Sequence, residues 1–99
     1  MTYENFVSSL RGNEIPNQFS LALQVLWYQK KGRWDRSHEI AQDMNTPEGA
    51  WLHAFLHRDE GDNRNAGYWY RQAGKPVPAV SIETEWEDLV RYFLEKDRD

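Results

Sequence analysis

The chain has 99 residues, of which 39% are hydrophobic and 14% aromatic, and its formal net charge is −4. This length suits one hydrophobic core, so we expect residues 1–99 to form a single domain. The absence of cysteine excludes disulfides, thiol nucleophiles and cysteine-ligated metal sites. The negative charge argues against nucleic acid as a partner, because binding to the phosphate backbone needs a positive surface.

The sequence carries no sign of a membrane segment. Its start, MTYENFVSSLRGNE, lacks an apolar run of the length found in signal peptides. No stretch approaches the 18 consecutive apolar residues of a transmembrane helix. We therefore expect a soluble, cytoplasmic protein without a membrane partner.

A short helix is predicted at the N-terminus. Four apolar side chains recur at i, i+3, i+4 and i+7, the spacing of one helix face: Tyr3, Phe6, Val7 and Leu10. Gly12 and Asn13 end this pattern, and Pro16 breaks the chain again.

Residues 17–44 predict a first helical hairpin. The run from 17 to 31 has strong helix formers without glycine or proline, and Asn17 is a suitable N-cap. This helix is apolar nearly all round, which is typical of a helix packed between neighbours. Gly32 interrupts it, and a second helix is predicted from about Trp34 to Met44.

Residues 47–74 predict a second hairpin with clear start and stop signals. Thr46 is a natural N-cap for its first helix. Gly61 breaks the chain, Asp62 can cap the next helix, and Gly74 ends it.

The second helix of this hairpin holds two informative features. Gly67 lies in its interior, where glycine destabilises a helix by about 1 kcal/mol, so we expect close approach to another backbone there. The consecutive residues Tyr68, Trp69 and Tyr70 cover about 200° of the helix circumference. At least one of these rings must therefore be exposed or lie in a groove.

A last helix is predicted over residues 81–96. The preceding KPVPA is an extended connector because its two prolines exclude a helix, and Ser81 is the N-cap. The apolar stripe of this helix comprises Ile82, Trp86, Leu89, Val90 and Phe93. We expect it to cover an open end of the helical stack; the alternative is a homodimer formed through the same stripe. No segment alternates as a strand does, so the fold class is all-α.

The two hairpins are copies of one pattern. An offset of 29 residues places Gly32 on Gly61 and Leu23 on Leu52. The turns KKGRWDRS and DEGDNRNA resemble those of tetratricopeptide repeats, and small residues occupy the corresponding close-packing positions: Val25, Ser37, Ala54 and Ala66. The resemblance covers roughly residues 20–78. It implies two such hairpins between an N-terminal helix and a C-terminal capping helix.

Residues 35–76 also resemble a group of small uncharacterised bacterial and fungal proteins. The shared pattern includes SH, PEG, HR-x-E-x-D and NA-x-YW. Its matching residues are Ser37, His38, Pro47, Glu48, Gly49, His53, His57, Arg58, Glu60, Asp62, Asn65, Ala66, Tyr68, Trp69, Tyr70 and Arg71. This resemblance implies no activity.

The first functional hypothesis is a module that binds a peptide or protein. By analogy with tetratricopeptide repeats, the first helices of the hairpins line a concave groove. Trp51, Phe55 and Arg58 would then form the binding surface. An exposed aromatic residue beside arginine, as at Tyr68 and Arg71, suits the same purpose.

The second hypothesis is a site built from the three histidines. His53 and His57 lie at i and i+4, the spacing of two metal ligands on one helix, and His38 can approach them if the hairpins stack. Glu39, Asp43 or Glu48 could add oxygen ligands. The alternative is that the histidines only hydrogen-bond between helices. No cofactor other than this metal is expected.

An acid–base or anion-binding pocket is a further possibility. It would combine His38, His57, Arg58, Asp62 and Arg71, whereas the alternative is an ion-pair network in which Arg58 and Asp62 form an ordinary surface pair. No activated nucleophile or phosphate loop accompanies these residues, so catalysis is not favoured. The candidate binding residues are thus His38, Trp51, His53, Phe55, His57, Arg58, Asp62, Asn65, Tyr68 and Arg71.

Overall fold

The computed structural model describes residues 1–97, and these fold into helices without any strand. The helices are α1 (Tyr3–Ser9), α2 (Leu21–Lys30), α3 (Trp34–Gln42), α4 (Pro47–Asp59), α5 (Asn63–Ala73) and α6 (Ile82–Lys96). The predicted all-α class is confirmed. Within residues 1–97, no helix has both the length and the apolar character needed to cross a membrane.

Local capping residues set the starts of α4 and α6. The Thr46 hydroxyl accepts a hydrogen bond from the Gly49 N–H at 2.9 Å. The Ser81 hydroxyl accepts one from the Thr84 N–H at 3.0 Å. Both predicted caps are confirmed, because each satisfies an N–H that the first helical turn leaves without a partner.

The start of α2 differs from the prediction. Asn17 is not its N-cap; Ser20 takes that role and accepts from the Leu23 N–H. The reason is a turn after Pro16, in which the Phe19 N–H donates to the Pro16 carbonyl at 3.3 Å. Residues 17–19 therefore belong to a loop, and the helix begins only after it.

Matching glycine turns join the two helices of each hairpin. Gly32 has a φ of +80° and Gly61 a φ of +90°. Residues with a side chain rarely adopt this left-handed backbone, so glycine is the natural residue at both turns. α2 packs against α3, and α4 against both α3 and α5.

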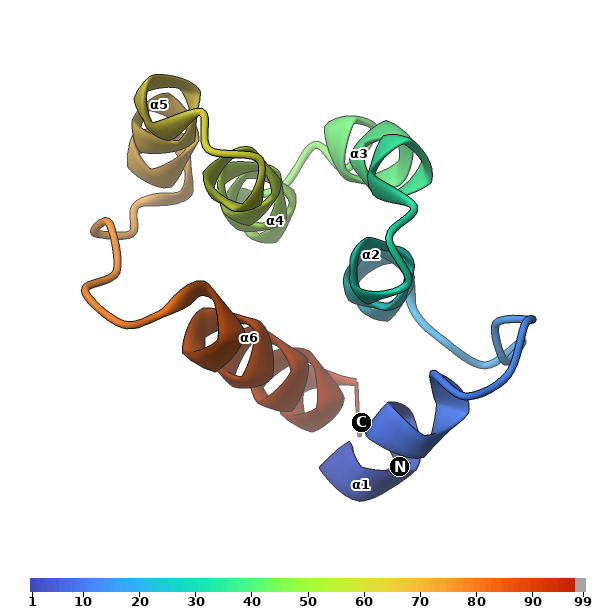
Figure 1. The fold of residues 1–99 in the computed structure, drawn as a ribbon. Coiled ribbons are helices and arrows are strands. Elements are labelled where there is room, and N and C mark those ends of the chain that lie inside the picture. Colours follow the sequence, from blue (N-terminus) through green and yellow to red (C-terminus); the bar gives the residue numbers. More distant parts are fainter. Residues whose placement is uncertain (98–99) are drawn as a thin grey trace.

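α6 lies across the inner side of the row formed by α2 to α5 (Figure 1). It contacts α2 and α4, and also α1, whose Phe6 is fully buried. The Trp86 indole N–H donates to the Leu26 carbonyl at 3.1 Å. The expectation that this helix covers an open end of the stack is therefore wrong, because its apolar stripe fills the inner face.

The close backbone approach expected at Gly67 occurs at Gly49 instead. A Cβ at Gly67 would have only the Arg71 Nη1 atom nearby, at 3.6 Å. A Cβ at Gly49 would lie 2.1 Å from the Met44 carbonyl oxygen and 2.6 Å from the Met44 Cβ. Glycine at position 49 thus allows the loop after α3 to pass tightly over the first turn of α4.

Candidate metal centre

Two helices bring the three histidines together. α4 carries His53 and His57 one turn apart, and α3 places His38 beside them. The Nε2 atoms of His38 and His53 are 2.9 Å apart. One ring nitrogen from each of the three residues lies within 4.8 Å of the others. We refer to these residues as the histidine cluster.

The local environment keeps His38 and His53 neutral near pH 7. Burial, together with the nearby His38 and His57, lowers the pKa of His53 to about 4. Burial also lowers the pKa of His38, with a second contribution from His57. In the 2.9 Å pair, one Nε2 carries a hydrogen and donates it while the other accepts. Neutral imidazoles keep a lone pair that can bind a metal.

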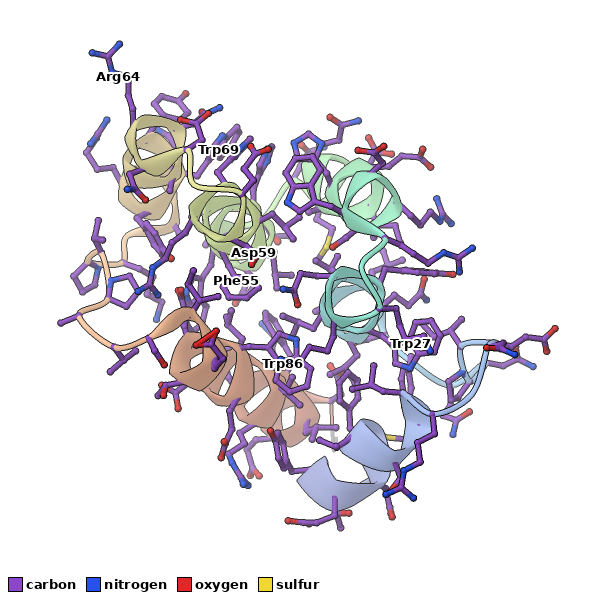
Figure 2. The ribbon with its side chains drawn as sticks, in the orientation of Figure 1. Trp27, Phe55, Asp59, Arg64, Trp69 and Trp86 are labelled. Atoms are coloured by element: carbon purple, nitrogen blue, oxygen red, sulfur yellow. The ribbon has the colours of Figure 1, made fainter. Side chains whose placement is uncertain are left out.

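Two tryptophans hold the imidazole planes. Trp34 of α3 stacks on His38, with ring centroids 4.8 Å apart and planes 13° from parallel. Trp69 of α5 stacks on His53 at 4.1 Å and 11°. The Trp34 indole N–H donates to the Leu56 carbonyl at 3.0 Å, which fixes that ring against α4. Figure 2 shows Trp69 on the side of α5 next to α4. Neither tryptophan was among the predicted site residues.

His57 has a carboxylate partner that also was not among the predicted site residues. Its Nδ1 is 2.7 Å from the Glu60 Oε2, one helical turn further along the chain. The remaining Nε2 is then the free nitrogen of His57. The i, i+3 spacing of these residues was the available signal, because residues three apart share a helix face.

Two of the three oxygen ligands suggested by the sequence have other partners. Glu39 pairs with Arg36 at 2.5 Å on the surface of α3. Glu48 pairs with Lys96 at 2.7 Å. Asp43 is exposed at the C-terminal end of α3. None of the three belongs to the histidine cluster.

A cavity of about 310 Å³ adjoins the cluster on the side where α3, α4 and α5 meet. His53 and Trp69 contribute to its wall, together with the amide side chains of Gln42, Asn45 and Gln72. Of the three histidines, only His53 lines it. A small polar molecule in this cavity would therefore contact the edge of the cluster.

The residues expected to line a concave groove face α6 instead. Phe55 is fully buried in the core, so its assignment to a binding surface is wrong. Trp51 packs against Tyr92 of α6, with ring centroids 5.1 Å apart. Figure 2 shows Phe55 and Trp86 in the interior between α4, α6 and α2. The cause is the position of α6, which occupies the inner face.

Arg58 also turns away from the histidines. Its Nη1 pairs with the Glu85 Oε1 at 2.7 Å, and its Nη2 donates to the Val80 carbonyl. The Tyr70 hydroxyl donates to the Glu85 Oε2 at 2.6 Å. Burial and this carboxylate raise the pKa of Tyr70. Glu85, which is only 3% exposed, thus joins α4, α5 and α6.

The pocket predicted from histidines and charged residues is assembled only in part: a carboxylate oxygen of Asp62 lies within 4.8 Å of a ring nitrogen of His57, whereas Arg58 pairs with Glu85. Asp62 is the N-cap of α5 and accepts from the Asn65 N–H at 3.2 Å, so it does not pair with Arg58. Asn65 and Arg71 are exposed positions of α5.

The three consecutive aromatic residues of α5 differ in exposure, as their positions around the helix require. Tyr68 is 47% exposed, whereas Tyr70 is buried and bonded to Glu85. Trp69 lies between these extremes and covers His53. The prediction that at least one of these rings is exposed is confirmed.

Comparison of the chain with protein-family models, curated proteins and solved structures finds no match. The resemblances to tetratricopeptide repeats and to the small bacterial and fungal proteins stay predictions.

Proposed function

We propose that the histidine cluster binds one divalent transition-metal ion of the zinc type. The observation that supports this most is the convergence of three imidazole nitrogens within 4.8 Å of one another. Imidazole is a preferred ligand of zinc, copper and nickel, and a chain without cysteine has no thiolate to compete for them.

One pair of these nitrogens already has a spacing close to what a tetrahedral ion needs. Zinc–nitrogen bonds of about 2.0–2.1 Å place two ligand nitrogens about 3.3 Å apart. The His38 and His53 nitrogens, at 2.9 Å, would separate by only a few tenths of an ångström. Their mutual hydrogen bond would be replaced by two metal bonds, with the ring hydrogens on Nδ1.

The residues around the cluster hold the imidazole rings in the orientation that metal binding needs. Glu60 accepts a hydrogen bond from Nδ1 of His57 when Nε2 binds metal, the carboxylate–histidine arrangement that orients a ligand and raises its basicity. Trp34 and Trp69 limit rotation of the other two rings. Little side-chain ordering remains to be done when the ion enters.

Three histidine ligands leave a fourth tetrahedral position for water or another small ligand. Metal sites of this type keep one position open, whereas purely structural zinc sites have four protein ligands. The cavity beside His53 provides space for such a ligand near the ion.

The proposal is tested by zinc binding to protein that has been stripped of metal with EDTA. Calorimetric titration and elemental analysis after dialysis are expected to give about one equivalent of zinc. Less than ~0.3 equivalents would exclude the site. H53Q should abolish stoichiometric binding, since it removes the central ligand.

E39Q is the matched control. Glu39 lies next to His38 in the sequence but pairs with Arg36 at the surface, so this change alters the local charge without removing a ligand. It should retain one equivalent. Equal loss of zinc in E39Q and H53Q would show nonspecific electrostatic binding and contradict the proposal.

A further inference from the structure

A second cavity lies on a different part of the molecule, where α4 and α6 approach the end of α5. It has a volume of about 230 Å³ and is lined by Trp51, Tyr92 and Glu48, among others. The Trp51 and Tyr92 rings meet edge to face, with centroids 5.1 Å apart and planes at 67°. No member of the histidine cluster contributes to it.

The chain places its own cation against these rings. The Lys75 Nζ lies 4.5 Å from the centroid of the Trp51 ring and 6.0 Å from that of Tyr92. An ammonium group at this range is attracted by the negative face of the ring. Two aromatic rings that share one cation form an incomplete aromatic cage.

The backbone of Lys75 is fixed although its side chain is exposed. Gly74 ends α5 with a φ of +70°, and the Lys75 N–H donates to the Tyr70 carbonyl at 3.0 Å. The C-terminal turn of α5 therefore positions the side chain over the rings. The side chain itself is an exposed one that can leave without disturbing the helix end.

The charges around the cavity favour exchange of one cation for another. Glu48 is the carboxylate at this cavity, and Lys96 is already paired with it at 2.7 Å. The pairing with Lys96 and, more weakly, the nearby Tyr92 lower the pKa of Glu48, which keeps this carboxylate charged. A second cation added beside Lys75 would meet two ammonium groups and one carboxylate. A cation that replaces Lys75 leaves the local charge unchanged.

We propose that Trp51, Tyr92 and Glu48 form a binding site for a methylated ammonium group, which Lys75 closes as an internal competitor. A quaternary ammonium brings apolar methyl groups to the two rings and is held less strongly by water than a lysine ammonium. It therefore gains more from the aromatic surface than Lys75 does. The ligand is either a small choline-like molecule or a trimethylated lysine of a peptide.

The test is a titration followed by the indole N–H signals in two-dimensional NMR, with the Trp51 signal assigned from its absence in W51L. Choline should shift the Trp51 signal of the wild-type protein at millimolar concentration. K75A should bind choline about two- to fivefold more tightly, the range expected from removal of one exposed cation–aromatic contact.

Two controls separate this site from general effects. 3,3-Dimethylbutanol, the neutral isostere of choline, should bind at least several-fold more weakly. K30A removes another cation that lies over a tryptophan, since the Lys30 Nζ is 4.6 Å from the Trp86 ring, but that ring is buried. K30A should leave choline binding unchanged.

The proposal is overturned if K75A shows no shift with choline, or if the neutral isostere binds equally well. Y92L must also lose binding while its circular dichroism stays native; Tyr92 is 39% exposed, which makes this change tolerable. A parallel titration with a trimethyllysine peptide distinguishes the two sources. Tighter binding of the peptide than of choline would assign the site to a modified protein tail.

Discussion

His38 and His53 form a 2.9 Å contact between Nε2 atoms although they belong to different hairpins. Trp34 stacks on the face of the His38 ring, and Trp69 stacks on the face of the His53 ring. A continuous row of four rings therefore runs from α3 across α4 to α5. A proton added to this row would place a buried charge beside another imidazole, so the native structure favours neutral histidines.

Metal-free protein should lose stability as the pH falls from about 6.5 to about 4. In the unfolded chain, His53 takes up a proton near its ordinary pKa of 6.5, whereas the native pKa is about 4. Between these values the unfolded state binds more protons, so lowering the pH stabilises it relative to the native state. The expected loss is about 3 kcal/mol, measured by urea unfolding between pH 7.5 and pH 4.

The H53Q variant serves as the control for this pH dependence. Carboxylates also contribute to unfolding at the acid end, and their contribution is common to both proteins. The stability difference between wild type and H53Q should therefore shrink as the pH falls. A constant difference from pH 7.5 to pH 4 would mean that His53 does not carry the effect.

The E85Q substitution should destabilise the protein by roughly 3 kcal/mol. It removes the buried carboxylate that holds Arg58 and Tyr70, and it leaves a largely buried guanidinium without its charge partner. Chemical denaturation at pH 7 measures the change. E87Q is the matched control on α6, because Glu87 pairs with Arg91 at the surface and should matter little. Equal effects of the two changes would contradict the assignment of Glu85.

Two glycine-to-alanine changes should have opposite effects. G49A places a methyl group against the backbone of Met44 and should destabilise by about 1–3 kcal/mol. G67A places one in ordinary contact with the flexible Arg71 side chain and should stabilise α5 by up to about 1 kcal/mol. Thermal unfolding of both variants checks this. Destabilisation by G67A would contradict the structure, because it would require an atom other than Arg71 Nη1 close to position 67.

Helix ends were predictable from the sequence where a single capping residue sets them. Thr46, Ser81 and Gly74 act on backbone groups within four residues, and such local signals are readable in a sequence. Asn17 failed as an N-cap because Pro16 starts a turn that delays the helix to Ser20. Asn17 and Ser20 are both suitable N-cap residues, and the choice between them depends on that turn.

Tertiary placement was less readable. The i, i+4 spacing of His53 and His57 indicated a shared face, but the tryptophans that cover the cluster come from two other helices. The apolar stripe of α6 indicates that this helix packs against another surface, but it does not indicate which surface. Glu85 beside Trp86 was an available signal, because a carboxylate next to such a stripe needs a partner from elsewhere in the fold.

The position of α6 has a consequence for how the molecule unfolds. In an open array each hairpin contacts only its neighbours and can unfold by itself. Here one helix contacts α2 of the first hairpin and α4 of the second, and its Trp86–Leu26 bond spans 60 residues of the chain. Release of α6 would expose apolar surface on both hairpins at once. Hydrogen exchange should therefore give buried amides of α2, α4 and α6 one common opening free energy, the behaviour of a single cooperative unit.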